Sequence, residues 1–214
     1  MPSPRADTLS QCLFFENNIL YSTCNATAET KSASTDIPGI LTLIQELADY
    51  EHASDAVLAT PESLARTLAF APSGLVSPSN TTPSTGDAIT PTRPARCLLL
   101  FAPSADSSMK NDPVGMALYF YNYSTWRACA GIYLEDLYVR EGERGKGYGR
   151  KLLSILAKEV VEMGGARLEW SVLKWNEPSI KFYEGPGVGA KAMDGWQTMR
   201  LDGEALVKLA KRAE

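Results

Sequence analysis

The chain has 214 residues, 44% of them hydrophobic, and 21 Lys and Arg against 25 Asp and Glu give it a formal net charge of −4 at pH 7. This length and composition predict one globular domain that can bury its own core. The acidic balance disfavours nucleic acid as a partner, and no run is apolar enough to indicate a membrane span or a signal peptide.

Four scattered cysteines and a single histidine offer no zinc-ligand spacing, so no metal is expected. The same usage is typical of a cytoplasmic protein with reduced thiols. Residues 1–34 are rich in Ser, Thr, Ala and Asn without a sustained period, which predicts a poorly ordered N-terminal tail. Only residues 12–15 and 19–21 in it could form a strand. The domain proper is expected over residues 35–214.

Two helices should follow the tail. The first begins near Asp36 and Pro38, with Asp36 as its cap, and the second begins at Thr60 and Pro61. The end of the first helix and the next loop carry five acidic residues and no Lys or Arg. They are Glu46, Asp49, Glu51, Asp55 and Glu62. Such a run either is a solvated face or attracts a cationic substrate.

Residues 71–95 read as a long, low-complexity loop. Strands are then predicted over residues 97–101, 114–121 and 132–139, in antiparallel arrangement. After a helix comes a strand near 167–172, a short helix capped by Asn176, a last strand over 196–201 and a closing helix capped by Asp202, with Ala205, Leu206 and Leu209 turned inward. Trp170, Trp175 and Trp196 are expected in the core. The fold class is α+β (α/β), with a mixed, mostly antiparallel sheet flanked by helices.

The stretch 134–164 organises the domain. Residues 134–139 alternate as a strand with one covered face, glycines recur at 145, 147 and 149, and apolar residues from Tyr148 onward recur at helical spacing until Gly164. A strand, a glycine turn and a helix N-terminus direct backbone N–H groups at one point, which suits a phosphorylated ligand. The loop lacks the Lys-Ser/Thr pair of a mononucleotide loop and the glycine spacing of a dinucleotide fingerprint. A glycine-rich turn that only caps a core helix is the alternative.

The loop RGKGYG at 144–149 resembles the pyrophosphate loop of the GNAT acetyltransferases. Four other runs occur in the order that this superfamily shows: LIQELADYE at 43–51, YLEDLYV at 133–139, WNEPSIKFY at 175–183 and GW at 195–196. Together they resemble the spermidine/spermine (diamine) and thialysine acetyltransferase branch, over roughly residues 36–210. The resemblance implies the GNAT fold, acetyl-CoA as co-substrate, a small amine as substrate, and a homodimer.

The resemblance also implies roles for individual residues. Tyr183 would be the general acid that protonates the CoA thiolate, and Glu135 would relay the proton of the amine. The amine would be held by Tyr50, Glu51, Glu135 and Asp136. The cofactor would be held by Leu137, Tyr138, Val139, Arg144, Gly145, Lys146, Gly147, Tyr148, Gly149, Asn176 and Ser179.

The chemistry requires these residue types. A lysine-like amine has a pKa of about 10.4 and arrives as an ammonium ion, so a carboxylate must attract it and take its proton before it can attack the thioester. Ser124 stands where the polyamine enzymes of the branch have Asp, which favours thialysine-like substrates over spermine. Two other functions stay open: a protein or peptide N-acetyltransferase, and a non-catalytic CoA-binding module. The alternative to a catalytic role is that Tyr183 is an ordinary core aromatic residue and that Glu135 is a structural carboxylate.

Overall fold

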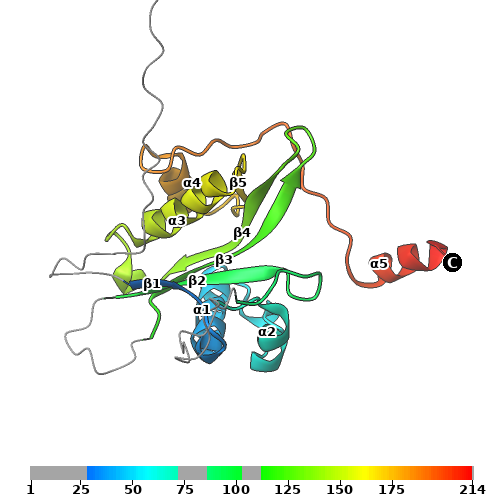
Figure 1. Cartoon of the computed structure of the whole chain (residues 1–214), viewed down its shortest axis with the longest axis horizontal. Coiled ribbons are helices and arrows are strands. Elements are labelled where there is room, and N and C mark those ends of the chain that lie inside the picture. The colour runs from blue at the N-terminus through cyan, green and yellow to red at the C-terminus, as the bar shows by residue number, and fades with distance from the viewer. Residues whose placement is uncertain (1–27, 72–85, 103–111, 214) are drawn as a thin grey trace, which may run out of the picture.

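The computed structural model describes residues 28–71, 86–102 and 112–213. Its centre is one sheet of five strands in the order β1-β2-β3-β4-β5, antiparallel except for the last pair. The strands are β1 (Ala28–Lys31), β2 (Ala95–Phe101), β3 (Gly115–Ser124), β4 (Cys129–Val139) and β5 (Leu168–Trp170). Figure 1 shows α3 and α4 on one face of this sheet and α1 and α2 on the other. The predicted mixed, mostly antiparallel sheet between helices is confirmed.

The helices begin where the sequence signals predict them. They are α1 (Ile37–Tyr50), α2 (Pro61–Thr67), α3 (Tyr148–Glu162), α4 (Glu177–Glu184) and α5 (Gly203–Ala210). Thr60 caps α2 by accepting the N–H of Ser63 at 3.2 Å. Asp36 does not cap α1 with its side chain, because that carboxylate accepts the N–H of Ala33 at 2.8 Å instead. Among the described residues, no helix has the length and apolar character needed to cross a bilayer.

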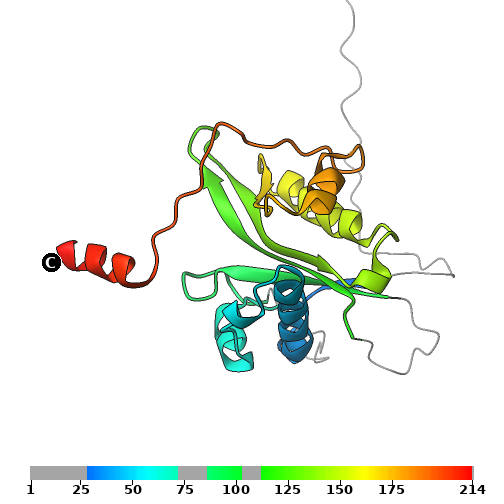
Figure 2. The same cartoon turned by 180° about the vertical axis from the view of Figure 1, so that it is seen from behind.

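Each face of the sheet has its own core, because successive side chains of a strand point to opposite faces. The α1 side buries Ile40 and Leu43 of α1 against Leu99 and Met116 of the sheet. The α3 side is filled by residues of β2, β3, β4 and α3. Its buried apolar members are Leu98, Leu100, Ala117, Tyr119, Ile132, Leu134, Leu152, Leu153, Leu156 and Val160. The two cores hold α1 and α3 on opposite faces of β4, the strand that carries the sequence motif (Figure 2).

A β-bulge interrupts β4. Leu118 of β3 lies opposite Asp136, but the next residue, Tyr119, lies opposite Leu134, so that Glu135 has no partner on β3. An extra residue reverses which face the following side chains point to. Leu134 therefore packs on the α3 side, whereas Tyr138, four residues later, is buried on the α1 side. The regular alternation predicted for residues 134–139 is wrong at this point, and two consecutive acidic residues mark the place.

The second half of β4 has a free edge. β5 pairs with β4 only at Ile132, Tyr133 and Leu134, and the chain then leaves the sheet towards α4. Beyond the bulge, the described residues provide no strand to pair with that edge. Backbone groups of residues 135–139 can therefore pair with an extended ligand, as in strand addition.

Parts of the predicted tail and of the predicted loop 71–95 are ordered against the rest of the domain. β1 lies inside the predicted tail and pairs with β2, whereas the predicted strands at 12–15 and 19–21 lie outside the described residues. In the predicted loop 71–95, residues 86–95 are held by Asp87. Its carboxylate pairs with Arg93 at 2.6 Å and accepts the N–H of Phe70 at 3.2 Å.

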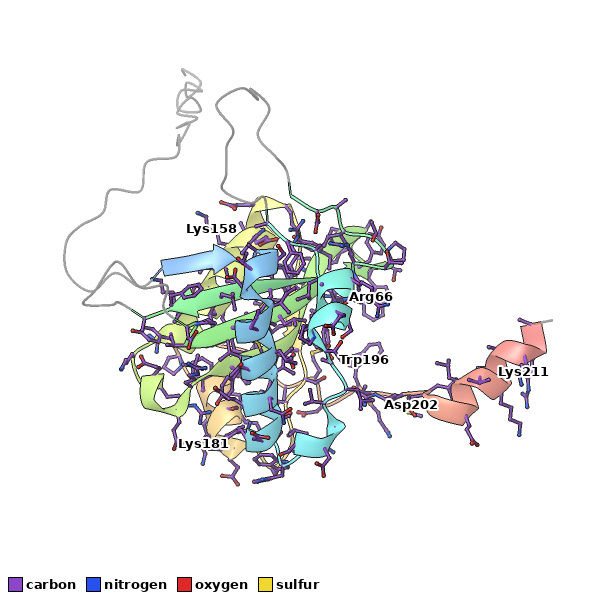
Figure 3. All side chains as sticks on the ribbon, turned by 90° about the horizontal axis from the view of Figure 1, so that it is seen from below. Arg66, Lys158, Lys181, Trp196, Asp202 and Lys211 are labelled. Atoms are coloured by element: carbon purple, nitrogen blue, oxygen red, sulfur yellow. The ribbon has the colours of Figure 1, made fainter. Side chains whose placement is uncertain are left out.

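The C-terminal segment differs most from expectation. Residues 196–201 form no strand, and α5 lies away from the sheet at the end of an extended stretch (Figures 1 and 3). Leu206 and Leu209 were predicted to point inward but are 51% and 53% exposed. Asp202 precedes α5 without a capping hydrogen bond from its side chain. In the part of the chain that the structure describes, neither core includes a residue of α5.

Candidate active site

The glycine loop leads directly into the N-terminus of α3. Gly145 and Gly147 have φ angles of +79° and +83°, and a Cβ atom at either position would have no atom within 4 Å. Positive φ suits glycine, and the open space beside the backbone leaves room for a ligand. The first N–H groups of a helix have no partner within it, and Gly147 caps α3 without a side chain. The loop and α3 together form an anion-binding geometry.

Arg144 is the basic residue held at this loop. Its Nε atom donates to the carbonyl of Val139 at 2.9 Å, and its guanidinium lies 4.8 Å from the ring centroid of Tyr50 and 5.8 Å from that of Tyr138. The two aromatic rings and the β4 carbonyl fix the direction of a side chain that is otherwise exposed. Lys146 is directed elsewhere, because its Nζ atom pairs with Glu143 at 2.9 Å.

Tyr183 lies on α4, the helix that follows β5. Asn176 begins this helix by accepting the N–H of Ser179 at 3.3 Å, and it is 95% buried, with 5% of its surface exposed. Tyr183 packs on Trp170 at 4.9 Å and on Phe182 at 5.2 Å between ring centroids. Burial raises the pKa of Tyr183 to about 12, and the charge of Glu51 adds to this effect. The hydroxyl therefore stays protonated at neutral pH.

Three carboxylates influence one another near the bulge, namely Glu51, Glu135 and Asp136. Asp136 is partly buried, and its pKa is raised to about 6, first by burial and then by the charges of Glu135 and Glu51. Burial also raises the pKa of Glu51, the residue that directly follows α1. The charge of Glu51 raises the pKa of Tyr183 as well as that of Asp136, so the carboxyl and the phenol share one electrostatic environment. Such a cluster attracts a cation and can accept a proton near neutral pH.

These features of fold and site agree with the comparisons with known proteins. Residues 82–185 match the acetyltransferase (GNAT) family. The chain is 36% identical over 196 residues to an L-ornithine N5-acetyltransferase from Arabidopsis thaliana, covering 83% of this chain and 85% of that protein. It is 33% identical over 179 residues to a thialysine N-epsilon-acetyltransferase from Bos taurus, covering 82% and 92%. The chain belongs to the GNAT family of acetyltransferases.

A solved structure shares the fold of this GNAT protein. An integron cassette protein of V. cholerae superposes with a TM-score of 0.62 at 22% sequence identity, over 86% of this chain and 98% of that one. The GNAT fold expected from the sequence is therefore confirmed. The protein is an N-acetyltransferase, and its reaction is acetyl transfer to an amine.

In this GNAT enzyme the structure brings most of the predicted site residues together. Tyr50 donates a hydrogen bond to Oδ1 of Asn176 at 3.1 Å, which joins the end of α1 to the start of α4. The charge of Glu51 raises the pKa of both Asp136 and Tyr183. Leu137 and Val139 are partly buried against the α3 core, as is Tyr148, while Tyr138 packs on the opposite side. Ser179 is half-buried in the first turn of α4.

Other predicted residues have different surroundings. Gly149 lies inside α3, and a Cβ there would make an ordinary van der Waals contact with the Phe182 ring at 3.4 Å, so α3 and α4 pack closely at this residue. Glu46 belongs to the acidic run but is neutralised by Arg140, whose Nε donates to both of its oxygens at 3.1 and 3.0 Å. Ser124 lies at the far end of β3, about 17 Å of strand beyond Tyr119, and so is remote from the carboxylates within one chain.

Two aromatic residues at the site were not identified from the sequence as site residues. Trp175 was predicted to lie in the core but is 49% exposed, and its ring lies 6.1 Å from Tyr50 and 5.6 Å from His52. His52 has a φ angle of +58°, which ends α1 in the manner of a glycine. The run HASD after Tyr50 and Glu51 contains no glycine, so only the backbone geometry reveals this turn.

Proposed function

We propose that this GNAT enzyme transfers the acetyl group of acetyl-CoA to a primary amine of a small diamine, polyamine or lysine analogue through a ternary complex. The observation that carries the proposal is the hydrogen bond from Tyr50 to Asn176, which joins the end of α1, where Glu51 follows, to the start of α4, which carries Tyr183. In keeping with this, the charge of Glu51 raises the pKa of both Asp136 and Tyr183. A cationic amine held by these carboxylates would lie beside both a proton acceptor and a proton donor. The thialysine and ornithine named for the relatives are amines of this kind.

The cofactor would use the free edge of β4 and the glycine loop. Backbone groups of residues 137–139 would pair with the pantetheine arm, and Arg144 with the N–H groups of Gly145 to Gly149 would hold the pyrophosphate. Open space beside Gly145 and Gly147 fits a bound phosphate group. Acetyl-CoA supplies the acetyl group as an activated thioester.

Residues of the site would then transfer the protons of the reaction. A carboxylate of the Glu51, Glu135 and Asp136 group would take the proton of the ammonium ion, directly or through water, so that the neutral nitrogen can attack the carbonyl carbon. The C–S bond breaks as the new C–N bond is completed, and Tyr183 would donate its proton to the leaving thiolate. The nitrogen would lose its second proton as the amide forms, and this proton would pass, directly or through water, to the Tyr183 phenolate. Asp136 is the member best suited to accept a proton near neutral pH, because its pKa is raised to about 6. This assignment shifts the base role from Glu135, which is exposed.

A thiol-release assay tests the proposal. The purified chain is given acetyl-CoA with thialysine, ornithine, lysine, putrescine, spermidine or a lysine-containing peptide, and free CoA thiol is measured over time. We expect turnover with at least one small amine, at a kcat/KM at least tenfold above that of the peptide. A preference for the peptide would favour a protein N-acetyltransferase, and CoA binding without turnover of any amine would favour a binding module.

We also propose that the enzyme is a homodimer, formed by the C-terminal segment 191–213. This segment is exposed throughout but rich in large apolar side chains. They are Met193, Trp196, Met199, Leu201, Leu206, Val207 and Leu209. Figure 3 shows Trp196 and Asp202 on the extended stretch that leads from the domain to α5. Apolar surface of this extent favours a second copy as the cover.

Light scattering tests the dimer. The parent chain should have twice the mass of one chain, 23.3 kDa, and Leu206→Asp with Leu209→Asp should reduce it to a monomer. Val161→Asp is the control, because Val161 is an exposed apolar residue on α3, 76% accessible. A monomeric parent at micromolar concentration would exclude this arrangement.

A further inference from the structure

Resting on the proposed function, we infer that Tyr50 is a positioning residue, which holds the arginine of the phosphate loop and the helix that carries Tyr183 in one rigid unit. The sequence assigned Tyr50 to the amine. In the structure, however, its ring contacts Arg144 of the glycine loop, and its hydroxyl bonds Asn176 at the start of the helix that carries Tyr183.

The ring of Tyr50 supports Arg144. The guanidinium lies over this ring at 4.8 Å from the centroid, within the distance at which a cation is attracted by an aromatic face. The Nε atom of Arg144 is already engaged with the carbonyl of Val139 at 2.9 Å. With the plane and one edge of the guanidinium fixed in this way, its remaining N–H groups are the ones available to a phosphate.

The hydroxyl of Tyr50 supports α4. It donates to Oδ1 of Asn176 at 3.1 Å, and the same oxygen accepts the N–H of Ser179 in the first turn of the helix. Asn176 is 5% exposed, so losing one of two donors leaves a buried acceptor less well satisfied. The orientation of the N-terminus of α4, and hence of Tyr183 two turns later, depends on this oxygen.

Tyr50 is suited to this role by its place in the fold. It is the last residue of α1, a helix fixed by the core on the other face of the sheet, whereas Arg144 and Asn176 follow β4 and β5. Trp175 contacts the Tyr50 ring at 6.1 Å and so limits its movement. The adjacent Glu51 belongs to the carboxylate cluster. Tyr50 thus joins three elements that are far apart in the sequence at the point where cofactor and amine would meet.

Two substitutions separate the ring from the hydroxyl. Tyr50→Phe keeps the ring and loses the hydrogen bond, and Tyr50→Leu loses both. For Tyr50→Phe we expect an unchanged dissociation constant for CoA by calorimetry, an amine KM within twofold of the parent, and a kcat lower by about 3–10-fold, the size of one net hydrogen bond. Tyr50→Leu should show the same loss of kcat and, in addition, a CoA dissociation constant raised by about 2–5-fold.

Two controls make the comparison specific. Tyr121→Phe removes a tyrosine hydroxyl from the other face of the sheet, where it bonds Glu159, and should lower the melting temperature without changing kcat or CoA affinity. In an Arg144→Met background, Tyr50→Phe and Tyr50→Leu should bind CoA equally. If Tyr50→Leu does not fold, Tyr50→Met, which has no aromatic face, replaces it.

The inference is overturned if Tyr50→Phe raises the amine KM fivefold or more with kcat unchanged, because Tyr50 would then contact the amine. It is also overturned if kcat stays within twofold of the parent, or if Tyr50→Leu binds CoA as tightly as Tyr50→Phe. The CoA affinities do not require turnover. A chain that acetylates no amine would therefore refute the proposed function and still allow the contact between Tyr50 and Arg144 to be tested.

Discussion

Glu135 and Asp136 are adjacent in the chain but have different environments, because Glu135 is the extra residue of the β4 bulge. Glu135 is exposed, whereas Asp136 is partly buried opposite Leu118 and near Glu51. A carboxylate in this position is costly for the folded state, since burial and like charges both disfavour ionisation. Such a cost is typical of a site selected for function rather than for stability.

The stability of the protein should therefore depend on Asp136 and on pH. The pKa of Asp136 is raised from 3.8 to about 6. The folded state thus binds this proton more tightly than the unfolded state, and the resulting stabilisation is complete below about pH 4 and lost as the pH rises through about 6. Above about pH 6, the free energy of unfolding of Asp136→Asn should exceed that of the parent by roughly 2–3 kcal/mol. Urea unfolding across this pH range measures the difference.

Glu135→Gln is the matched control for that series, because it removes the neighbouring charge from an exposed position. It should lower the apparent pKa of Asp136 only slightly and change stability by less than about 0.5 kcal/mol. An Asp136→Asn variant whose stability follows that of the parent at every pH would mean that Asp136 is not held in a raised-pKa environment.

Gly147→Val should abolish CoA binding. The φ angle of +83° at Gly147 is unfavourable for a β-branched residue, and the added side chain would occupy the open space beside the loop where a phosphate would lie. Gly142→Ala is the control, since Gly142 also faces open space but has no positive φ. Calorimetry with CoA should show no binding for the first variant and parental affinity for the second. Equal affinities would remove the loop from the cofactor site.

Tyr183→Phe should separate chemistry from binding. The ring keeps its contacts with Trp170 and Phe182 at 4.9 and 5.2 Å, while the proton donor is lost. We expect kcat to fall by roughly 10²–10⁴-fold with CoA affinity unchanged. Steady-state kinetics and calorimetry measure the two quantities. A kcat within a factor of two of the parent would reduce Tyr183 to a packing residue.

Glu159 should be important for stability and not for catalysis. On the α3 side of the sheet its carboxylate accepts the hydroxyls of Tyr119 and Tyr121 and pairs with Lys31 at 3.2 Å. Burial alone would raise the pKa of Glu159, but these hydrogen bonds and the Lys31 charge outweigh it and lower the pKa. The stabilisation is therefore present above the unfolded pKa of 4.5 and lost as the pH falls.

At pH 7, Glu159→Gln should lower the free energy of unfolding by about 1–3 kcal/mol, because a buried charge-assisted network loses its acceptor charge. Glu162→Gln, an exposed change one turn later on α3, should change it by less than about 0.5 kcal/mol. Denaturant titration of both variants and an activity assay decide the matter. Loss of activity without loss of stability in Glu159→Gln would contradict this assignment.

Features that depend only on residues close together in the chain could be predicted from the sequence alone. The caps at Thr60 and Asn176, the helix after the glycine loop and its end at Gly164 follow from local hydrogen bonding and backbone preference. The motif 144–149 depends on the same local geometry, since glycines with positive φ leave a helix N-terminus open. For that reason the family and the phosphate loop could be inferred from the order of short motifs.

Features that depend on residues distant in the chain could be seen only once the chain was folded. The bulge at Glu135 is a mismatch between two strands, and it selects Asp136 rather than Glu135 as the buried carboxyl. The hydrogen bond from Tyr50 to Asn176 joins residues 126 positions apart. The predicted strand at 196–201 has suitable residues but pairs with no other strand among the described residues. Strand pairing, burial and long-range contacts arise between surfaces that come together only in the folded chain. No local sequence pattern specifies which surfaces these will be.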